Sequence, residues 1–489
     1  MTEFRLFVFL AVFFLFKIDI RGQDSVGEPY DSTGILDYEK NRPIQATLLT
    51  VGLNMGVWSF DRYVKNAEYA KIGFDTMKEN FKKGFVWDND QMSTNIFMHP
   101  YHGNLYFNSA RESGFNFWQS GLFALGGSAM WEFLMESEYP SANDIISTPF
   151  GGMALGEVCY RISDLLVDDR TRGLNRIGRE VGVFMISPIK SVLRVVNGEA
   201  WQHREIKGSR FNDVPVDCSF SLGMRTLYQK DGNGDFGIGL VSEFQMEYGD
   251  KFSEKNSVPF SYFRLNTSLN ILKSQPILGE FNIIGRLLNK PLIETEKLNL
   301  NIGVFQHYDY YDSDSLSQNS KRIPYKFGTP ASVGLGAMVL NRNFLNGTLN
   351  GEIYVNGVLL GAVLSDYYLV DARNYNFSCG VNVKSNVDFK FCDNKYCVSL
   401  SHNYYRLFTS KGYGKEVKLE GVNPKTINVQ GDESQSSISF MKVRFDAKVV
   451  NNLYLSMSMS NVLRCTDYKY FNKIYSNSFD GRLMLTYRF

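Results

Sequence analysis

The feature that most constrains this chain is an alternation of apolar and polar residues that runs from about Val181 to Phe489. Between Phe236 and Tyr248 six apolar side chains occupy even positions, and glycine or polar residues occupy most odd ones. The same alternation recurs in residues 441–449 and 453–459. Because successive side chains of a strand point to opposite faces, these segments are predicted to be strands with one apolar and one polar face.

Two folds use such strands: a soluble sandwich with its apolar faces inward, and a membrane barrel with them toward lipid. The predicted strands are about 9 to 13 residues long, as a tilted strand crossing a bilayer needs. Short turns such as 231–235 and 450–452 alternate with long polar loops such as 409–437. We therefore expect an α+β protein, with a mostly helical domain over 43–175 and an antiparallel transmembrane β-barrel of about 12 strands over 181–489. The stretch 288–329 does not follow the alternation cleanly.

The last predicted strand ends on an aromatic residue. Phe479, Leu483, Leu485, Tyr487 and Phe489 share one face of it. This ending resembles the closing strand of Gram-negative outer-membrane proteins, whose terminal aromatic residue is read by the barrel-assembly machinery. The resemblance implies a place in the cell outer membrane, with membrane lipid and that machinery as partners. It also implies that Tyr487 and Phe489 form the assembly signal.

The N-terminus predicts export. Arg5 precedes an unbroken apolar run, Leu6–Phe16, and charged residues follow it. A helix that crosses a hydrocarbon core needs about 20 residues, so this shorter run is predicted to belong to a secretory signal peptide over 1–22. The 52 Lys and Arg nearly cancel the 51 Asp and Glu, and no basic stripe stands out, so nucleic acid is not an expected partner.

Helical spacing marks the segment between the leader and the barrel. Apolar residues recur at intervals of four and three from Asp61 to Phe85, which predicts an amphipathic helix. A second helix is predicted over 117–135, where glycine, alanine and serine favour close helix packing. Ser141, with Asp144 three residues on, is predicted to cap a further helix, and Thr148-Pro149 repeats the start signal.

Several short motifs occur in a fixed order between residues 87 and 157. They are WDND at 87–90, HPYHGNLY at 99–106, GSAMWE at 127–132, PSAND at 140–144 and TPFGG at 148–152. The combination resembles the family catalogued as domain of unknown function 3943, found in envelope proteins with a signal peptide and a C-terminal barrel. The resemblance implies an envelope location and assigns no activity. The order Glu132, Ser141-x-x-Asp144, Gly152-x-x-x-Gly156 also resembles VanZ-like small membrane domains.

Four residues of this segment are catalytic candidates, namely His99, His102, Glu132 and Asp144, because imidazole and carboxyl groups exchange protons. The alternative is structural: histidines bonded to backbone around a Pro-Gly turn, and Glu132 in a buried ion pair with Arg111. A zinc site needs a third protein ligand, and no cysteine or further histidine lies near the pair in the sequence. We expect no metal and no cofactor.

The candidate ligand contacts are Arg111, Trp131, His307 and Tyr308, and the small-molecule ligand is not identified by the sequence. Cys392 and Cys397 lie between two strand-like runs. If both face the barrel interior, they form a disulfide across the hairpin; the alternative is two unpaired thiols.

Three functions fit these observations. The first is a non-enzymatic role in envelope transport or maintenance, by a barrel with a polar lumen and a fused helical domain. The second is a hydrolase of envelope lipid or peptidoglycan that uses His99, His102, Glu132 and Asp144. The third is a structural or adhesive surface protein, suggested by the long loops.

Overall fold

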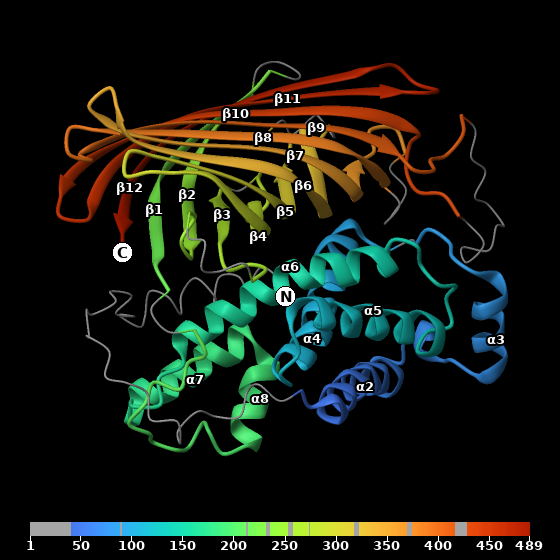
Figure 1. The fold of residues 1–489 in the computed structure, drawn as a ribbon. Helices are drawn as coiled ribbons and strands as arrows, with labels where there is room; N and C mark the ends of the chain where they lie inside the picture. The colour runs from blue at the N-terminus through green and yellow to red at the C-terminus, as the bar shows by residue number, and fades with distance from the viewer. Residues whose placement is uncertain are drawn as a thin grey trace. The chain divides into compact units, whose positions relative to one another are not determined.

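The computed structural model describes residues 41–88, 90–211, 214–230, 235–252, 258–272, 274–316, 322–368, 374–415 and 428–489. The chain forms two compact units, one of helices and one of strands (Figure 1). The first comprises Met1–Asp88 and Ser93–Pro215, and the second comprises Asn89–Met92 and Val216–Phe489. The predicted signal peptide, residues 1–22, lies outside the described residues.

The helical unit confirms the expected N-terminal class. Its α-helices are α2 (Pro43–Ser59), α3 (Phe74–Lys83), α4 (His99–Arg111), α5 (Phe117–Leu134), α6 (Asp144–Leu166), α7 (Gly173–Ile186) and α8 (Pro188–Val196). Shorter helical turns cover Phe60–Val64, Glu68–Ala70 and Thr94–Met98. Among the described residues, no helix has both the length and the hydrophobicity to cross a membrane.

Glycines allow α4, α5 and α6 to pack at close range. A Cβ on Gly103 of α4 would lie 1.8 Å from the carbonyl oxygen of Thr148 in α6. A Cβ on Gly152 would lie 2.5 Å from the backbone of Gly103, and one on Gly127 of α5 would meet the ring of Tyr106 at 2.6 Å. The small residues therefore serve helix packing, as the sequence predicted for 117–135.

Two helix predictions were wrong in detail. The segment from Asp61 to Phe85 is not one helix, because Asn66 has a φ of 51° and α3 starts afresh after Gly73. For Ser141 only the helix start was misplaced: α6 begins at Asp144, while the Ser141 hydroxyl accepts the expected hydrogen bond from the Asp144 amide, at 3.3 Å. The predicted second start at Thr148-Pro149 was wrong, because Pro149 lies inside α6, in its second turn.

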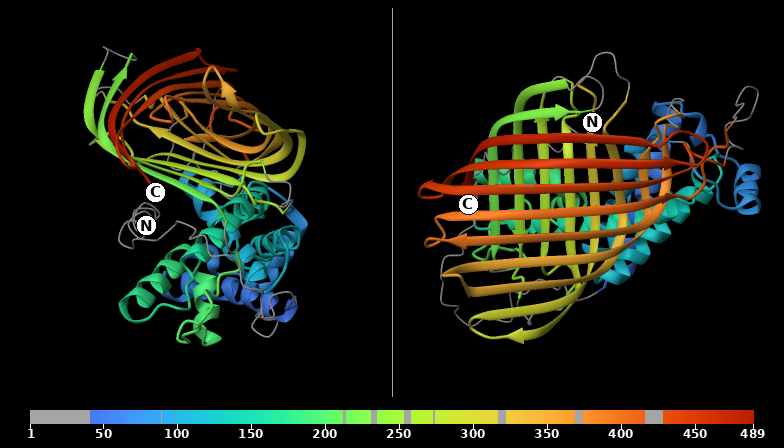
Figure 2. Two further views of the ribbon diagram at one scale, coloured as in Figure 1. Left: turned by 60° about the vertical axis from the view of Figure 1, so that its left-hand side comes forward. Right: turned by 90° about the horizontal axis from the view of Figure 1, so that it is seen from above.

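The second unit is a closed antiparallel barrel of twelve described strands, which confirms the predicted fold class (Figure 2). The strands are β1 (Val216–Gln229), β2 (Asp235–Tyr248), β3 (Phe263–Ile271), β4 (Leu278–Glu294), β5 (Leu298–Ser313), β6 (Tyr325–Phe344), β7 (Gly347–Leu364), β8 (Tyr375–Phe391), β9 (Tyr396–Thr409), β10 (Ser434–Val450), β11 (Leu453–Tyr468) and β12 (Ile474–Arg488). The predicted start at residue 181 was wrong, because α7 and α8 continue the helical pattern to Val196.

The register places apolar and polar residues on opposite faces of the barrel wall. One row of direct neighbours runs across β10, β11, β12, β1 and β2, each residue 37–55% exposed: Phe445, Met457, Leu483, Met224 and Leu240. The other face is buried and polar. Asp446 pairs with Ser456 and Ser221 pairs with both Thr486 and Glu243, while the hydroxyl groups of Ser456 and Thr486 are hydrogen-bonded at 2.6 Å. The exterior of this part of the barrel is therefore apolar and the interior is polar.

Bulges explain why the alternation fails over 288–329. The pairing of β4 with β5 shifts between Arg286 and Leu288 and again between Pro291 and Ile293. The pairing of β5 with β6 shifts between His307 and Asp309. Each extra residue reverses the face that the following side chains occupy, so the period-2 pattern changes phase within one strand.

The two ends of the barrel differ in their connections. Turns of two to four residues join β4 to β5, β6 to β7, β8 to β9 and β10 to β11, at the end where β1 begins and β12 finishes; we name this the short-turn end. The connection 410–433 lies at the opposite, long-loop end. The β1–β2 turn at 231–235, expected to share an end with 450–452, also lies at the long-loop end, and residues 231–234 are outside the described residues.

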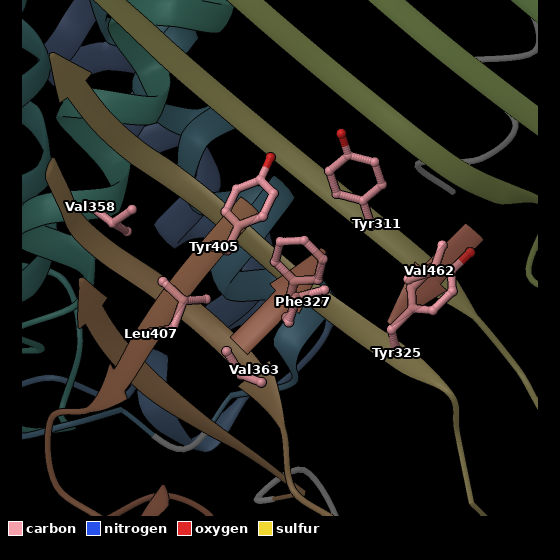
Figure 3. Close-up of a cluster of buried hydrophobic side chains, with 9 residues drawn as sticks. Tyr311, Tyr325, Phe327, Val358, Val363, Tyr405, Leu407 and Val462 are labelled. Atoms are coloured by element: carbon pink, nitrogen blue, oxygen red, sulfur yellow. The ribbon is translucent and has the colours of Figure 1, made fainter. Parts of the chain in front are cut away.

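An aromatic cluster fills part of the interior near the long-loop end. It consists of the buried residues Tyr311, Tyr325, Phe327, Val358, Val363, Tyr405, Leu407, Ile438 and Val462, with Phe440 packed against them. Figure 3 shows the rings of Phe327 and Tyr405 directed toward each other from β6 and β9. The rings of Tyr311 on β5 and Phe440 on β10 stack at 4.3 Å, although these strands are not neighbours in the sheet. The cluster therefore bridges opposite walls of the barrel.

Candidate functional site

The two histidines lie on a helix and not at a turn, which corrects the predicted Pro-Gly turn. His99 is the first residue of α4 and His102 follows one helical turn later. The π-helical turn Thr94–Met98 runs directly into α4, so Pro100 lies just after a π-turn within a continuous helical segment. Both imidazoles therefore leave the same region of the helix surface.

His99 contacts the start of α6. Its Nε2 atom lies 3.4 Å from Oδ1 of Asp144. The same oxygen accepts a 2.9 Å hydrogen bond from the side chain of Asn143, whose amide nitrogen also donates to Asn95 at 2.9 Å. The carboxylate lies at a helix N-terminus, where the helix dipole favours negative charge. Two of the four catalytic candidates are thus in direct contact.

Glu132 is buried on α5 without the arginine predicted for it. Its Oε2 accepts a 2.6 Å hydrogen bond from the backbone amide of Ser141. Burial, and then the nearby carboxylates of Glu136 and Asp144, raise the pKa of Glu132 above its ordinary value. Its surroundings therefore disfavour the charged form of this carboxyl group.

Arg111 pairs with a different carboxylate. Its guanidinium binds Glu157 of α6 with two hydrogen bonds, of 2.7 and 2.9 Å, and Arg161 binds the same carboxylate at 2.9 Å. Although burial alone would raise it, the two arginines hold the pKa of Glu157 below its ordinary value. Arg111 is at the last turn of α4, opposite Glu157, and so the predicted pair with Glu132 was wrong. We assign Arg111 to the link between α4 and α6.

His102 is partly buried between two aromatic rings. Its imidazole stacks on Tyr106 at 5.0 Å and lies 5.5 Å from the ring of Trp131, whose Nε1 donates to Glu136 at 3.1 Å. Among the described residues, its buried Nε2 atom has no hydrogen-bond partner. Desolvation, followed by repulsion from His99, lowers the pKa of His102 to about 4. The ring is therefore neutral at physiological pH and packs as an aromatic side chain.

The two candidate contacts on β5 point in opposite directions. His307 faces the interior, where its Nδ1 lies 3.2 Å from Nζ of Lys384. Lys384 also binds both carboxylate oxygens of Asp309 at 2.6 Å. Tyr308 lies on the other face and its ring contacts Phe281 at 5.6 Å. The two residues therefore do not form a common ligand site.

The predicted disulfide was wrong. Both cysteines are free thiols: Cys392 is exposed and Cys397 is buried. Cys392 lies in the turn between β8 and β9 with a φ of 50°, and the residue opposite Cys397 in the ladder is Lys390. Cys392 is therefore not opposite Cys397 in the ladder, and the Sγ atom of Cys397 lies 3.8 Å from Oγ of Ser399.

The interior charges of the barrel were not singled out from the sequence. Glu243 on β2 accepts hydrogen bonds from Lys442 at 3.0 Å, from Arg444 at 2.8 Å and from Arg482. Asp480 binds Arg225 at 2.8 Å. The charged residues that alternate with apolar ones in β10 and β12 indicate a charged inner face. They do not indicate its ion pairs, because the partners on β1 and β2 are distant in sequence.

A cavity of about 390 Å³ lies within the charged interior. Its lining runs from Cys218, Lys390 and Phe489 near the short-turn end to Glu280 and Tyr311. A second cavity of about 70 Å³ is lined by Glu280 and Tyr311 as well, and by Tyr325 of the aromatic cluster. The larger space is therefore polar and ends at the aromatic cluster.

Comparisons with known proteins bear on both units. Residues 84–189 match the model of the family described as Domain of unknown function (DUF3943). No curated protein matches the chain. Among solved structures, the NanC porin is similar, with 7% identity and a TM-score of 0.27 over 54% of this chain and 98% of that one. The anion-selective porin from Comamonas acidovorans has 8% identity and a TM-score of 0.23 over 57% of this chain and 100% of that one. Outer-membrane expressed OmpT of Vibrio cholerae has 8% identity and a TM-score of 0.24 over 57% and 99%. At such scores these likenesses do not decide what this barrel does.

Proposed function

We propose that this chain, whose residues 84–189 match the DUF3943 family model, is an integral outer-membrane β-barrel protein with a non-enzymatic role in envelope transport or maintenance. The observation that carries the proposal is the row of exposed apolar residues from Phe445 to Leu240 on the outer face of the barrel. The inner face of the same strands is charged. Contiguous apolar patches of this kind are rare on soluble monomers and are the rule on the lipid side of membrane barrels.

Closure of the sheet supports the same location. Every strand has two hydrogen-bonded neighbours, because β12 pairs with β1 from Ser219↔Arg488 to Gln229↔Ser478. A bilayer offers no water to backbone groups, so only helices and closed barrels can span it. The closing strand also carries Tyr487 and Phe489, which we propose are read by the barrel-assembly machinery.

The structure of the barrel interior favours binding of a small polar solute over its free diffusion through the lumen. The cavity of about 390 Å³ is within the range of small-molecule sites, and the stacked rings of Tyr311 and Phe440 cross the barrel beyond it. We therefore propose that a solute is held in the lumen and does not pass through an open pore.

Fractionation of cells that produce the full chain tests the location. The protein is expected in the outer-membrane fraction, resistant to alkaline washing, and faster on a gel when unheated than when boiled, because a folded barrel stays compact in detergent. Recovery as a soluble periplasmic protein would overturn the proposal.

A hydrolase is the second candidate function, favoured by one observation. His99 and Asp144 are in contact, and the charge of His99 acts on both Glu132 and His102, so the four candidates lie in one region. If they are catalytic, replacing both histidines with glutamine abolishes the phenotype of the protein and leaves its thermal stability unchanged. The packing of His102 instead predicts that stability and function fall together.

A further inference from the structure

We propose that the lumenal cavity binds a small organic cation, of the alkylammonium or diamine class, through the carboxylate of Glu280. This inference names the solute class of the proposed function and rests on it for a folded barrel with an accessible lumen. It does not depend on which membrane holds the barrel.

Glu280 occupies the junction of the two lumenal cavities. It lies near the start of β4, is half-buried, and contributes to the lining of both spaces. In the register it is opposite Tyr311 of β5 and Ser268 of β3. A solute that moves inward from the short-turn end therefore meets this carboxylate where the aromatic cluster begins.

The carboxylate of Glu280 has no hydrogen bond or ion pair with any described residue. Other interior carboxylates are each bound to a cation at 2.6–2.8 Å, namely Glu243, Asp309, Glu352, Asp446 and Asp480. A half-buried carboxylate without a protein partner is stabilised when a counter-charge or hydrogen bonds are supplied. The carboxylate of Glu280 is therefore available to bind a cationic solute in the cavity.

Two cations that line the smaller cavity together with Glu280 are already engaged. Lys442 and Arg482 act electrostatically on Glu280, but Lys442 donates to Glu243 at 3.0 Å and Arg482 binds Asp480 at 2.8 Å. The carboxylates of Glu243 and Asp309 repel the negative charge of Glu280, whereas Lys442 and Arg482 attract it. A cationic group beside Glu280 would therefore gain a direct partner without displacing an existing ion pair.

The surroundings favour an organic cation over a metal ion. Calcium takes six to eight oxygen ligands and magnesium demands a tight octahedron, whereas Glu280 is a single carboxylate at this point of the wall. The stacked rings of Tyr311 and Phe440 offer an apolar surface beside it, suited to methylene groups. Asn403, whose amide donates to the Tyr311 hydroxyl at 3.1 Å, adds a polar group to the same wall.

Calorimetric titration of the full-length protein in detergent tests the site with three probes of similar length: 1,4-diaminobutane, butane-1,4-diol and succinate. We expect the diamine alone to bind, and Glu280→Gln to weaken that binding by about tenfold or more, as loss of a charge-assisted hydrogen bond implies. The matched control is Glu294→Gln, an exposed residue of the same strand, which should bind the diamine as the natural protein does.

A folded barrel is verified for each variant by its faster migration when unheated. Absence of diamine binding by the natural protein, equal binding by Glu280→Gln, or preference for succinate would each overturn the inference. These failures would leave the outer-membrane proposal standing, because that proposal falls only if the protein fails to fractionate with the outer membrane.

Discussion

At the scale of single residues, burial decides how the candidate groups behave. His102 and Glu132 lie on neighbouring helices, yet desolvation moves the pKa of the histidine down and that of the glutamate up. Both shifts favour the neutral form, as expected for groups that are removed from water. The helical unit therefore has a pH-dependent stability that can be measured without knowing its function.

The histidine gives a defined pH window. Because the pKa of His102 is about 4 in the folded protein and about 6.5 in an unfolded chain, the unfolded state takes up the proton first as the pH falls. The neutral ring of His102 contributes fully to the free energy of unfolding above pH 6.5. This contribution is lost as the pH falls toward 4, by up to about 3 kcal/mol.

Tryptophan fluorescence reports the unfolding of the helical unit selectively, because all five tryptophans precede residue 216. The thermal midpoint of the natural protein should fall between pH 6.5 and 4 by more than that of His102→Gln, which does not titrate. Parallel pH profiles for the two proteins would show that His102 is not held neutral by the fold.

At the scale of elements, the contact between α4 and α6 depends on two glycines that face each other. Gly152→Ala would place a methyl group against the backbone of Gly103, which cannot move as a flexible side chain does. We expect a loss of about 1–3 kcal/mol or more in the free energy of unfolding. Gly126→Ala is the matched control, because nothing lies within 4 Å of the added Cβ and alanine favours a helix by about 1 kcal/mol over glycine.

Denaturant unfolding followed by tryptophan fluorescence compares these two variants. A Gly152→Ala protein as stable as Gly126→Ala would contradict the close approach of α4 to α6.

The closing strand permits a second prediction for an element. Deletion of Phe489 removes the backbone amide that donates to Cys218 at 2.9 Å and the ring that contacts Tyr487 at 4.9 Å. If the terminal ring is the assembly signal, the deletion should reduce the heat-modifiable protein in the outer membrane, whereas Phe489→Tyr should restore it. Normal assembly of the deletion variant would mean that the terminal aromatic residue is not read.

Some features of the helices and strands could be predicted from the sequence and others could not. The alternation in 441–459 predicted strand identity and faces correctly, because the period of a strand is a local property. The bulges near Leu288 and Pro291 were not predicted, because a bulge is defined by the partner strand. The partner of Arg111 was missed for the same reason: helix packing places Glu157 opposite it, and no spacing in the chain encodes that choice.

At the scale of the whole molecule, the chain divides its polar chemistry between two units. The helical unit buries ion pairs and neutral candidates among glycine-packed helices, while the barrel encloses charges around a cavity and presents apolar side chains outside. Burial of polar groups inside and exposure of apolar groups outside is the reverse of a soluble fold and matches a lipid environment. We therefore expect the barrel to insert into a membrane.

The most direct test places one charge on either face of the same strand. Leu400 of β9 is 47% exposed on the outer face, and its neighbour Ser399 lines the lumenal cavity. Arginine on the lipid side of a barrel costs about 2–4 kcal/mol near the bilayer midplane, while lumenal positions tolerate it. The yield of folded, heat-modifiable barrel in lipid vesicles should therefore fall for Leu400→Arg and be retained for Ser399→Arg. Full folding of Leu400→Arg, with Ser399→Arg the more damaging change, would contradict a lipid-facing wall.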